Sequence, residues 1–216
     1  MRRVWLGAAV FVVSLLVLAQ VGLPLLAERA VRDELAEVGT VDSVDVRAFP
    51  ALKLLFEEAD SVRVRMAEAS VGTGDLGDRL ASTQRVGKLD LSIDVLSLGP
   101  LEVRDVGLRK DGDALVGEAS LTTADLEAAL PVDLGLRPVE SDDGSLVLEA
   151  QLGPVGVRAR LSAAAGTLLI APDGLLGGFA SLTLFDDSRV QVSGVRAQPF
   201  EGGFTIVANA TLQPRD

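Results

Sequence analysis

The fold class is decided by segments such as Lys88–Val95, whose sequence is KLDLSIDV. Apolar residues occupy every second position, so an extended chain would have one aliphatic face and one polar face. The same alternation appears in Val41–Ala48 and Ser61–Glu68. It is typical of strands in an antiparallel sheet that buries one face and leaves the other in water. The side chains expected on the buried face of the first segment are Leu89, Leu91, Ile93 and Val95.

Further strands are predicted after these segments. Leu101–Leu108 and Ala114–Leu121 are expected to pair through a turn at Lys110–Asp113, where a glycine lies between two aspartates. A short helix is expected at Ala124–Leu130, ended by Pro131, and a loop at Asp133–Gly144. The other predicted strands are Ser145–Leu152, Val155–Ala163, Thr167–Ala171, Ser181–Phe185, Arg189–Val195 and Phe204–Leu212. The sequence therefore predicts an α+β domain with a large antiparallel meander.

A helical pattern runs from Pro24 to Val38, before the first strand. Gly39 is a plausible C-cap for this helix. Its apolar stripe has two interpretations: it covers the sheet as an ordinary amphipathic helix does, or it lines a groove for lipid. The stripe is predicted to contain Ala27, Ala30, Val31, Leu35 and Val38.

The N-terminus predicts export. Arg2 and Arg3 precede an uncharged run, Val4–Ala27, of 24 residues, and a bilayer-spanning helix needs about 20. Residues 1–27 are therefore expected to be either a cleaved signal peptide or a retained membrane anchor. Both alternatives place residues 28–216, as a single domain, outside the cytoplasmic membrane.

Composition excludes several classes of function. The chain has no cysteine and no histidine, so it cannot form a Ser-His-Asp triad, a Cys-His dyad or a histidine-ligated metal site. Its net charge of −11 argues against nucleic acid and against electrostatic docking on anionic lipid. A carboxylate pair for glycoside hydrolysis stays open on composition alone, but the acidic residues lie in alternating or turn positions, where solvated acids are expected. We therefore predict a protein that is not an enzyme and uses no cofactor or metal. Any lipid it recognises should be held mainly by its acyl chains.

Two apolar clusters lie where polar loops are expected. Phe49–Phe56 reads FPALKLLF and is expected to form a turn or short helix, and Leu175–Phe179 reads LLGGF between two strands. If buried, these clusters are core; if exposed, they mark a ligand groove or a membrane contact. The second resembles a flap flanked by glycines. The candidate lipid-binding residues here are Phe49, Leu52, Leu55, Phe56, Leu175, Leu176 and Phe179.

Taken in order, several motifs resemble the actinobacterial LmeA-type phospholipid-binding proteins. The order is a leader running into a helix, an aromatic-Pro-x-Leu cluster, an alternating strand, a Ser/Thr-rich helix start and a final hairpin. One departure is the pair Glu57-Glu58, where relatives commonly have a glycine and a basic residue. The motifs are Pro24–Arg29, Phe49–Phe56, Ser61–Arg65, Ala119–Leu126, and Arg189–Val195 with Phe204–Val207.

The resemblance implies half of a tubular lipid-binding (TULIP/BPI-like) fold. In that fold a strongly curved antiparallel sheet wraps around a long N-terminal helix, and acyl chains lie between them. The expected partners are a phospholipid or other acyl lipid and the membrane, and the resemblance also implies a role in assembling envelope lipids or lipoglycans. The alternative is a structural envelope protein whose sheet face is filled by its own side chains. The arginines Arg63 and Arg65, on one strand face, are expected to be either solvated or part of a rim that touches lipid phosphate.

Overall fold

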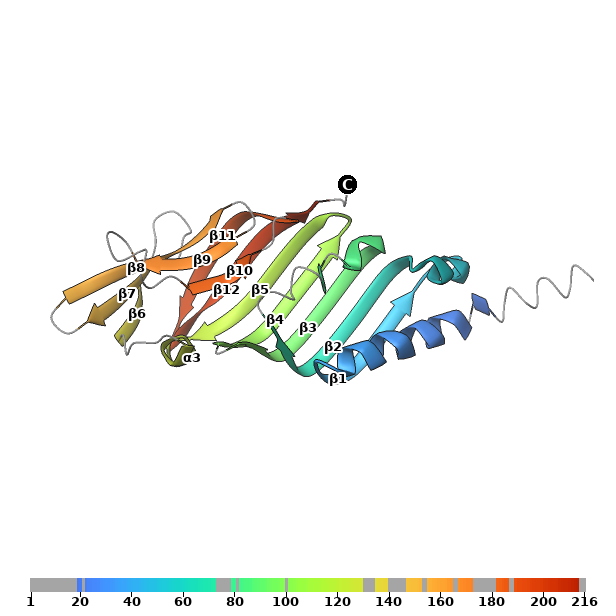
Figure 1. Cartoon of the computed structure of the whole chain (residues 1–216), viewed down its shortest axis with the longest axis horizontal. Coiled ribbons are helices and arrows are strands. Elements are labelled where there is room, and N and C mark those ends of the chain that lie inside the picture. Colours follow the sequence, from blue (N-terminus) through green and yellow to red (C-terminus); the bar gives the residue numbers. More distant parts are fainter. Residues whose placement is uncertain are drawn as a thin grey trace, which may run out of the picture.

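The computed structural model describes residues 19–20, 22–72, 79–80, 82–99, 101–129, 135–139, 147–152, 155–164, 167–172, 182–186 and 189–213. These residues form an α+β structure with a seven-stranded sheet, a five-stranded sheet, an N-terminal helix and a few short helices (Figure 1). The predicted α+β class is confirmed.

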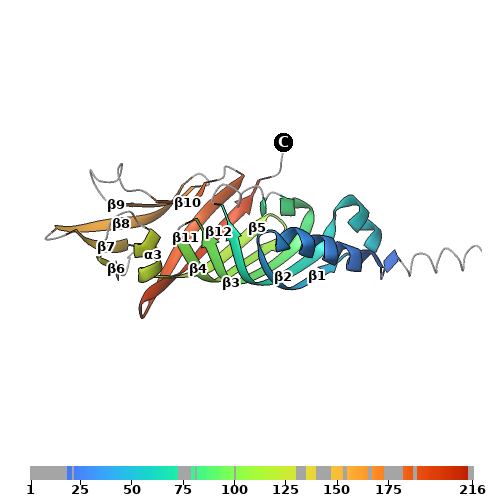
Figure 2. The ribbon, with the colours of Figure 1, turned by 60° about the horizontal axis from the view of Figure 1, so that its bottom comes forward.

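The seven-stranded sheet has the order β1-β2-β3-β4-β5-β12-β11 and is open, with β1 and β11 at its edges. Figures 1 and 2 show its strands running side by side across the long axis of the molecule. The strands are β1 (Gly39–Arg47), β2 (Ala59–Val71), β3 (Val86–Leu98), β4 (Leu101–Asp111), β5 (Ala114–Thr122), β11 (Val190–Phe200) and β12 (Gly203–Leu212).

The prediction of a wholly antiparallel meander is wrong at one pair, because β2 and β3 are parallel. Ala59 pairs with Val86 and Val71 with Leu98, so the chain returns to the start of β2 before β3 begins. A parallel pair needs a crossover of about a dozen residues, and the segment between Val71 and Val86 is long enough. It includes the 3-10 helix η2 (Thr83–Arg85). Alternating hydrophobicity reports which face is buried, but it does not report strand direction.

The five-stranded sheet corrects a second prediction. Its order is β10-β9-β8-β7-β6, and β6 lies inside the segment Asp133–Gly144 that was expected to be a loop. The polar character of that segment made it look like a loop, but β6, which contains Pro138, is an edge strand that pairs only with β7. A proline is tolerated there because its missing N–H is not needed by a second neighbour. The strands are β6 (Gly135–Val139), β7 (Val147–Leu152), β8 (Val155–Ala164), β9 (Thr167–Pro172) and β10 (Leu182–Asp186).

The N-terminal helix, which covers residues 22–36, packs against the core of the seven-stranded sheet. Its contacts are made by the predicted stripe except Ala30, which is exposed. At about 100° per residue, Ala30 lies about 60° outside the sector that the packed side chains occupy. The residues of the stripe that pack are Ala27, Val31, Leu35 and Val38.

Gly39 belongs to β1 and is not the predicted cap. The helix ends instead where the Val38 N–H donates to the Leu35 carbonyl at 3.0 Å. Glycine is required at position 39 because a Cβ there would lie 2.0 Å from the Glu68 carbonyl oxygen on β2. The residue is therefore set by close strand approach and not by a left-handed helix end.

On the buried face of the sheet, the alternation of buried and exposed residues shifts by one position partway along the strands. One row of inward side chains is Met66, Ile93 and Val106, and the next row is Ala69, Leu96 and Val103. Two residues separate the rows on each strand, where strict alternation would allow one. A register irregularity occurs at the same level of β4, where Asp105 has a φ of 49°. Leu96, instead of the predicted Val95, is therefore the buried residue. Such an irregularity changes the face to which the following side chains point.

The short helix α3 (Thr123–Ala129) confirms the helix predicted at Ala124–Leu130. The Asp125 N–H donates to Thr122 Oγ1 at 3.1 Å, which is the bond that an N-cap threonine supplies. The helix then buries Leu126, which is 1% exposed, in the main core.

Candidate functional site

The inner face of the seven-stranded sheet is aliphatic over six strands. Its buried centre comes from β1 to β5 and β12, and half-buried apolar side chains surround that centre. Those at the margin include Leu91, Val106, Ala119, Val195 and Ala197. Apart from Lys110 near the end of β4, the charged side chains of the same strands point to the opposite face, so the apolar surface is largely one-sided, as the alternation predicts.

The loop after β1 forms a second apolar surface. It contains the 3-10 helix η1 (Ala51–Phe56), which confirms the predicted turn or short helix. Ala51 is 1% exposed, and Leu54 packs against the main core. The remaining apolar side chains point to solvent, with exposures of 77% for Phe49, 40% for Leu52, 63% for Leu55 and 69% for Phe56. The cluster is therefore a surface patch, the second of the two alternatives left open by the sequence.

A carboxylate holds the start of this loop. Asp60 accepts the Phe49 N–H at 2.5 Å and Lys53 Nζ at 2.8 Å. Both bonds favour the charged carboxylate, the lysine bond most, and they lower the pKa of Asp60. The same bond raises the pKa of Lys53. Both groups thus stay ionised at neutral pH, although the loop is otherwise apolar.

An arginine from beyond the loop holds its end. Arg85 Nη1 donates to the Phe56 carbonyl at 3.1 Å and lies 2.8 Å from Glu57 Oε2. Glu57 ends η1 in the left-handed conformation, with a φ of 61°. The loop therefore has polar restraints at both ends while its large apolar side chains are solvent-exposed.

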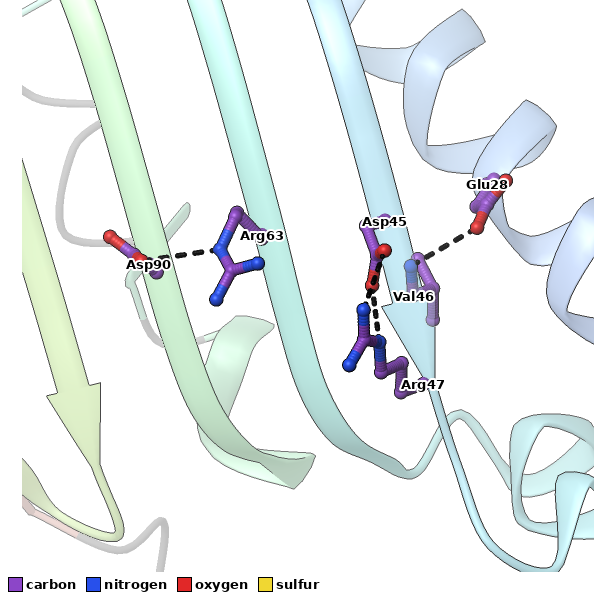
Figure 3. A network of polar contacts seen from close by, with 6 residues as sticks. All are labelled: Glu28, Asp45, Val46, Arg47, Arg63 and Asp90. Atoms are coloured by element: carbon purple, nitrogen blue, oxygen red, sulfur yellow. Dashed lines mark hydrogen bonds and ion pairs between the residues drawn. The ribbon is translucent and has the colours of Figure 1, made fainter.

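The N-terminal helix is tied to the same loop and to the edge strand. Gln20 Nε2 donates to the Ala48 carbonyl at 3.2 Å, and Gln20 Oε1 accepts the Ala51 N–H at 2.9 Å. Glu28 Oε1 accepts the Val46 N–H at 3.4 Å, on β1 (Figure 3). The Glu28 carboxylate thus bonds a backbone N–H that the edge strand β1 would otherwise leave to water. Sequence reasoning missed Gln20, although it is one of two polar residues in the uncharged run Val4–Ala27.

The outer face of the sheet carries charged side chains in pairs. Figure 3 shows Arg63 of β2 reaching Asp90 of β3, at 3.3 Å, and Arg47 paired with Asp45 on β1, at 2.9 Å. Arg65 is exposed beside them. A hollow of about 470 Å³ on this part of the sheet is lined by both pairs, by further charged residues of β3 and β4, and by apolar residues such as Val62, Leu89 and Val116.

Lys110 is the one buried charged side chain among those the structure describes, with 4% of its surface exposed. It lies on the inner face near the end of β4, although the sequence placed it in a polar turn. Its Nζ donates to the Val86 carbonyl. Burial lowers the pKa of Lys110, and the nearby Asp113 and Asp111 oppose that shift.

Some predicted features lie outside the described residues. The second apolar cluster, with Leu175, Leu176 and Phe179, is one of them, as is most of the run Val4–Ala27. No helix within the described ranges is both long and apolar enough to cross a membrane. The described side chains also include no group of three or more acidic residues placed to hold a metal ion.

Comparison with protein families identifies the chain. The LmeA-like phospholipid-binding family matches residues 18–216. The chain belongs to this family. The resemblance noted from the sequence motifs is thereby confirmed, and membership of the LmeA-like family supports phospholipid as the partner. The chain matches no curated protein and no solved structure.

Proposed function

We propose that this protein is a non-catalytic phospholipid-binding protein of the cell envelope. Acyl chains would lie against the aliphatic face of the seven-stranded sheet, beside the N-terminal helix, with the sheet curving around both. The observation that carries the proposal is the one-sided aliphatic face in a member of the LmeA-like phospholipid-binding family.

Burial of acyl chains supplies enough free energy for such binding. Each methylene transferred from water to an apolar surface contributes about 0.8 kcal/mol. A phospholipid with two chains can therefore bind tightly without a cationic headgroup site. The acidic net charge of −11 fits this mode, because it offers no long-range attraction to anionic lipids.

The margin of the inner face is the part that a lipid would cover. Ala119 on β5 is half-buried and pairs with Ile206 of β12, which is 6% exposed. Its neighbour Glu118 is exposed on the opposite face. A bulky side chain at position 119 would thus enter the lipid-facing space, whereas the same side chain at position 118 would enter water.

The test is lipid extraction from the purified full chain, followed by mass spectrometry. We expect phospholipid in the wild-type protein and in Glu118→Trp, and a loss of most of it in Ala119→Trp. Melting curves of all three proteins must agree closely, so that lipid loss does not follow from unfolding. Absence of phospholipid from the wild type, together with no uptake from vesicles, would refute the proposal.

A structural role without a ligand is the second candidate. It is favoured by one observation: Ala27, Val31, Leu35 and Val38 of the helix already pack against the inner core. In this candidate the helix and the sheet fill the space by themselves. The lipid extraction separates the two, because a face filled by side chains leaves no stoichiometric lipid.

The proposed location outside the cytoplasmic membrane rests on Arg2, Arg3 and the uncharged run after them. Two aspartates in place of Val12 and Val13 should stop the run from entering the bilayer. We expect this variant to stay in the cytoplasm of a fractionated cell, and its recovery outside would contradict the proposed export.

A further inference from the structure

We infer that the loop Phe49–Phe56 is a membrane-docking tip that inserts its exposed apolar side chains into the surface of a zwitterionic bilayer. This inference goes beyond the proposed lipid binding, because docking requires no lipid inside the protein. The residues of the tip are Phe49, Leu52, Leu55 and Phe56.

The loop is built to keep these side chains exposed. Asp60 and Arg85 hold its two ends, Gln20 holds Ala48 and Ala51, and Ala51 and Leu54 fix its inner side. A loop restrained in this way cannot easily turn its apolar side chains inward. Two phenylalanines and two leucines exposed together form a patch of the kind that marks an interaction surface.

The position of the tip favours a bilayer as its occupant. Gln20, which binds the loop, lies within the uncharged run Val4–Ala27, so the apolar N-terminal sequence enters the described structure beside the tip. Figures 1 and 2 show the start of the N-terminal helix and the end of β1 at the same end of the molecule. Leu25 and Leu26, on the first turns of the same helix, are also exposed, at 53% and 60%.

The charges around the tip indicate a zwitterionic surface. Lys53 is paired with Asp60 and Arg85 with Glu57, and Glu58 is exposed beside them. The tip therefore presents no unpaired cation among its described side chains to attract anionic lipid. We expect docking through apolar contact, with little dependence on salt.

The test measures where the tip lies while the full chain is bound to vesicles. The chain has no cysteine, so Leu55→Cys introduces the single thiol for a fluorescent label. The matched control is Phe200→Cys, because Phe200 is 43% exposed and lies on β11, at the opposite edge of the sheet. Nitroxide lipids in phosphatidylcholine vesicles should quench the label at 55 and leave the label at 200 bright. A label at 55 that is quenched only by a water-soluble quencher would overturn the inference.

A second variant separates the tip from the N-terminal run. In a chain labelled at Leu52→Cys, Phe56→Asp should lower the vesicle partition coefficient about tenfold, as read from lipid quenching over a lipid titration, because burying a large apolar side chain is worth at least one decade in partitioning. Val116→Asp, at an exposed apolar residue of β5, should leave it unchanged. Equal quenching in all these chains would refute a role for the tip. So would quenching that requires anionic lipid and is lost in salt, or protection of the label by dimerisation without lipid.

The lipid-extraction test reports on a different property. Ala119→Trp should lose bound phospholipid yet keep the label at 55 in the bilayer. Failure of the proposed lipid binding and failure of docking can therefore be told apart.

Discussion

The inner face of the sheet and the tip after β1 are both apolar, yet they have opposite exposure. Phe204 on the inner face is fully buried, whereas Phe49 at the tip is 77% exposed. On the sheet, apolar residues alternate with polar ones, so burial of one face leaves the other face solvated. At the tip, the apolar residues follow one another with only Lys53 between them, and polar bonds fix the backbone. The difference shows that an apolar sequence predicts burial only where the periodicity of the backbone places its apolar side chains on one face.

The largest expected effect comes from the centre of the inner face. Phe204→Ala should lower the free energy of unfolding by about 3–5 kcal/mol, because it opens a cavity among buried side chains. Denaturant unfolding of the wild type and the variant measures this difference. A loss below about 1 kcal/mol would mean that this side chain is not packed as the structure places it.

Lys110 should give the next largest effect, and one that depends on pH. Burial lowers its pKa in the folded state below the 10.5 of the unfolded chain, so the unfolded state binds more protons between these two values. Stability of the wild type should therefore rise as the pH increases through this window.

Lys110→Met removes the buried charge and should remove that rise in stability. The comparison is made by unfolding the wild type and the variant at neutral pH and near pH 10. Identical pH dependence in the two proteins would contradict a lysine whose pKa is lowered by burial at this position.

Gln20 joins the N-terminal segment to the tip loop and should have an intermediate effect. Gln20→Ala removes the bonds to the Ala48 carbonyl and the Ala51 N–H, which we expect to cost about 1 kcal/mol. Hydrogen exchange should then increase at Ala51 more than at Val64, which lies inside β2. Uniform exchange at both positions would show that Gln20 does not restrain the loop.

The smallest expected effect is the counterpart of the first. Phe49→Ala should change the free energy of unfolding by no more than about 0.5 kcal/mol, because the side chain is already in water. The same denaturant experiment that measures Phe204→Ala is the check. A large loss would mean that Phe49 is covered in solution, and the contrast between the two regions would fail.

Local pattern was enough to predict much of the fold. Alternation located β1 to β5, β11 and β12, and a glycine between aspartates located the turn between β4 and β5. The Ser/Thr-rich stretch before Ala124 predicted the start of α3, and the structure shows that Thr122 makes the N-cap bond. The helix stripe was also correct, apart from Ala30. These features depend on residues close together in the chain.

The sequence by itself determined which residues would share a face, the one-sided aliphatic surface, and membership in the LmeA-like family. Only the tertiary structure decided that β2 and β3 are parallel, that β6 is a strand, and that Leu96 replaces Val95 in the core. It also decided that Lys110 is buried and the tip exposed. The physical reason is that period and capping act over a few residues. Strand partner, register and burial depend on contacts between residues far apart in the chain, such as those that join Gln20 to Ala51 and Lys110 to Val86.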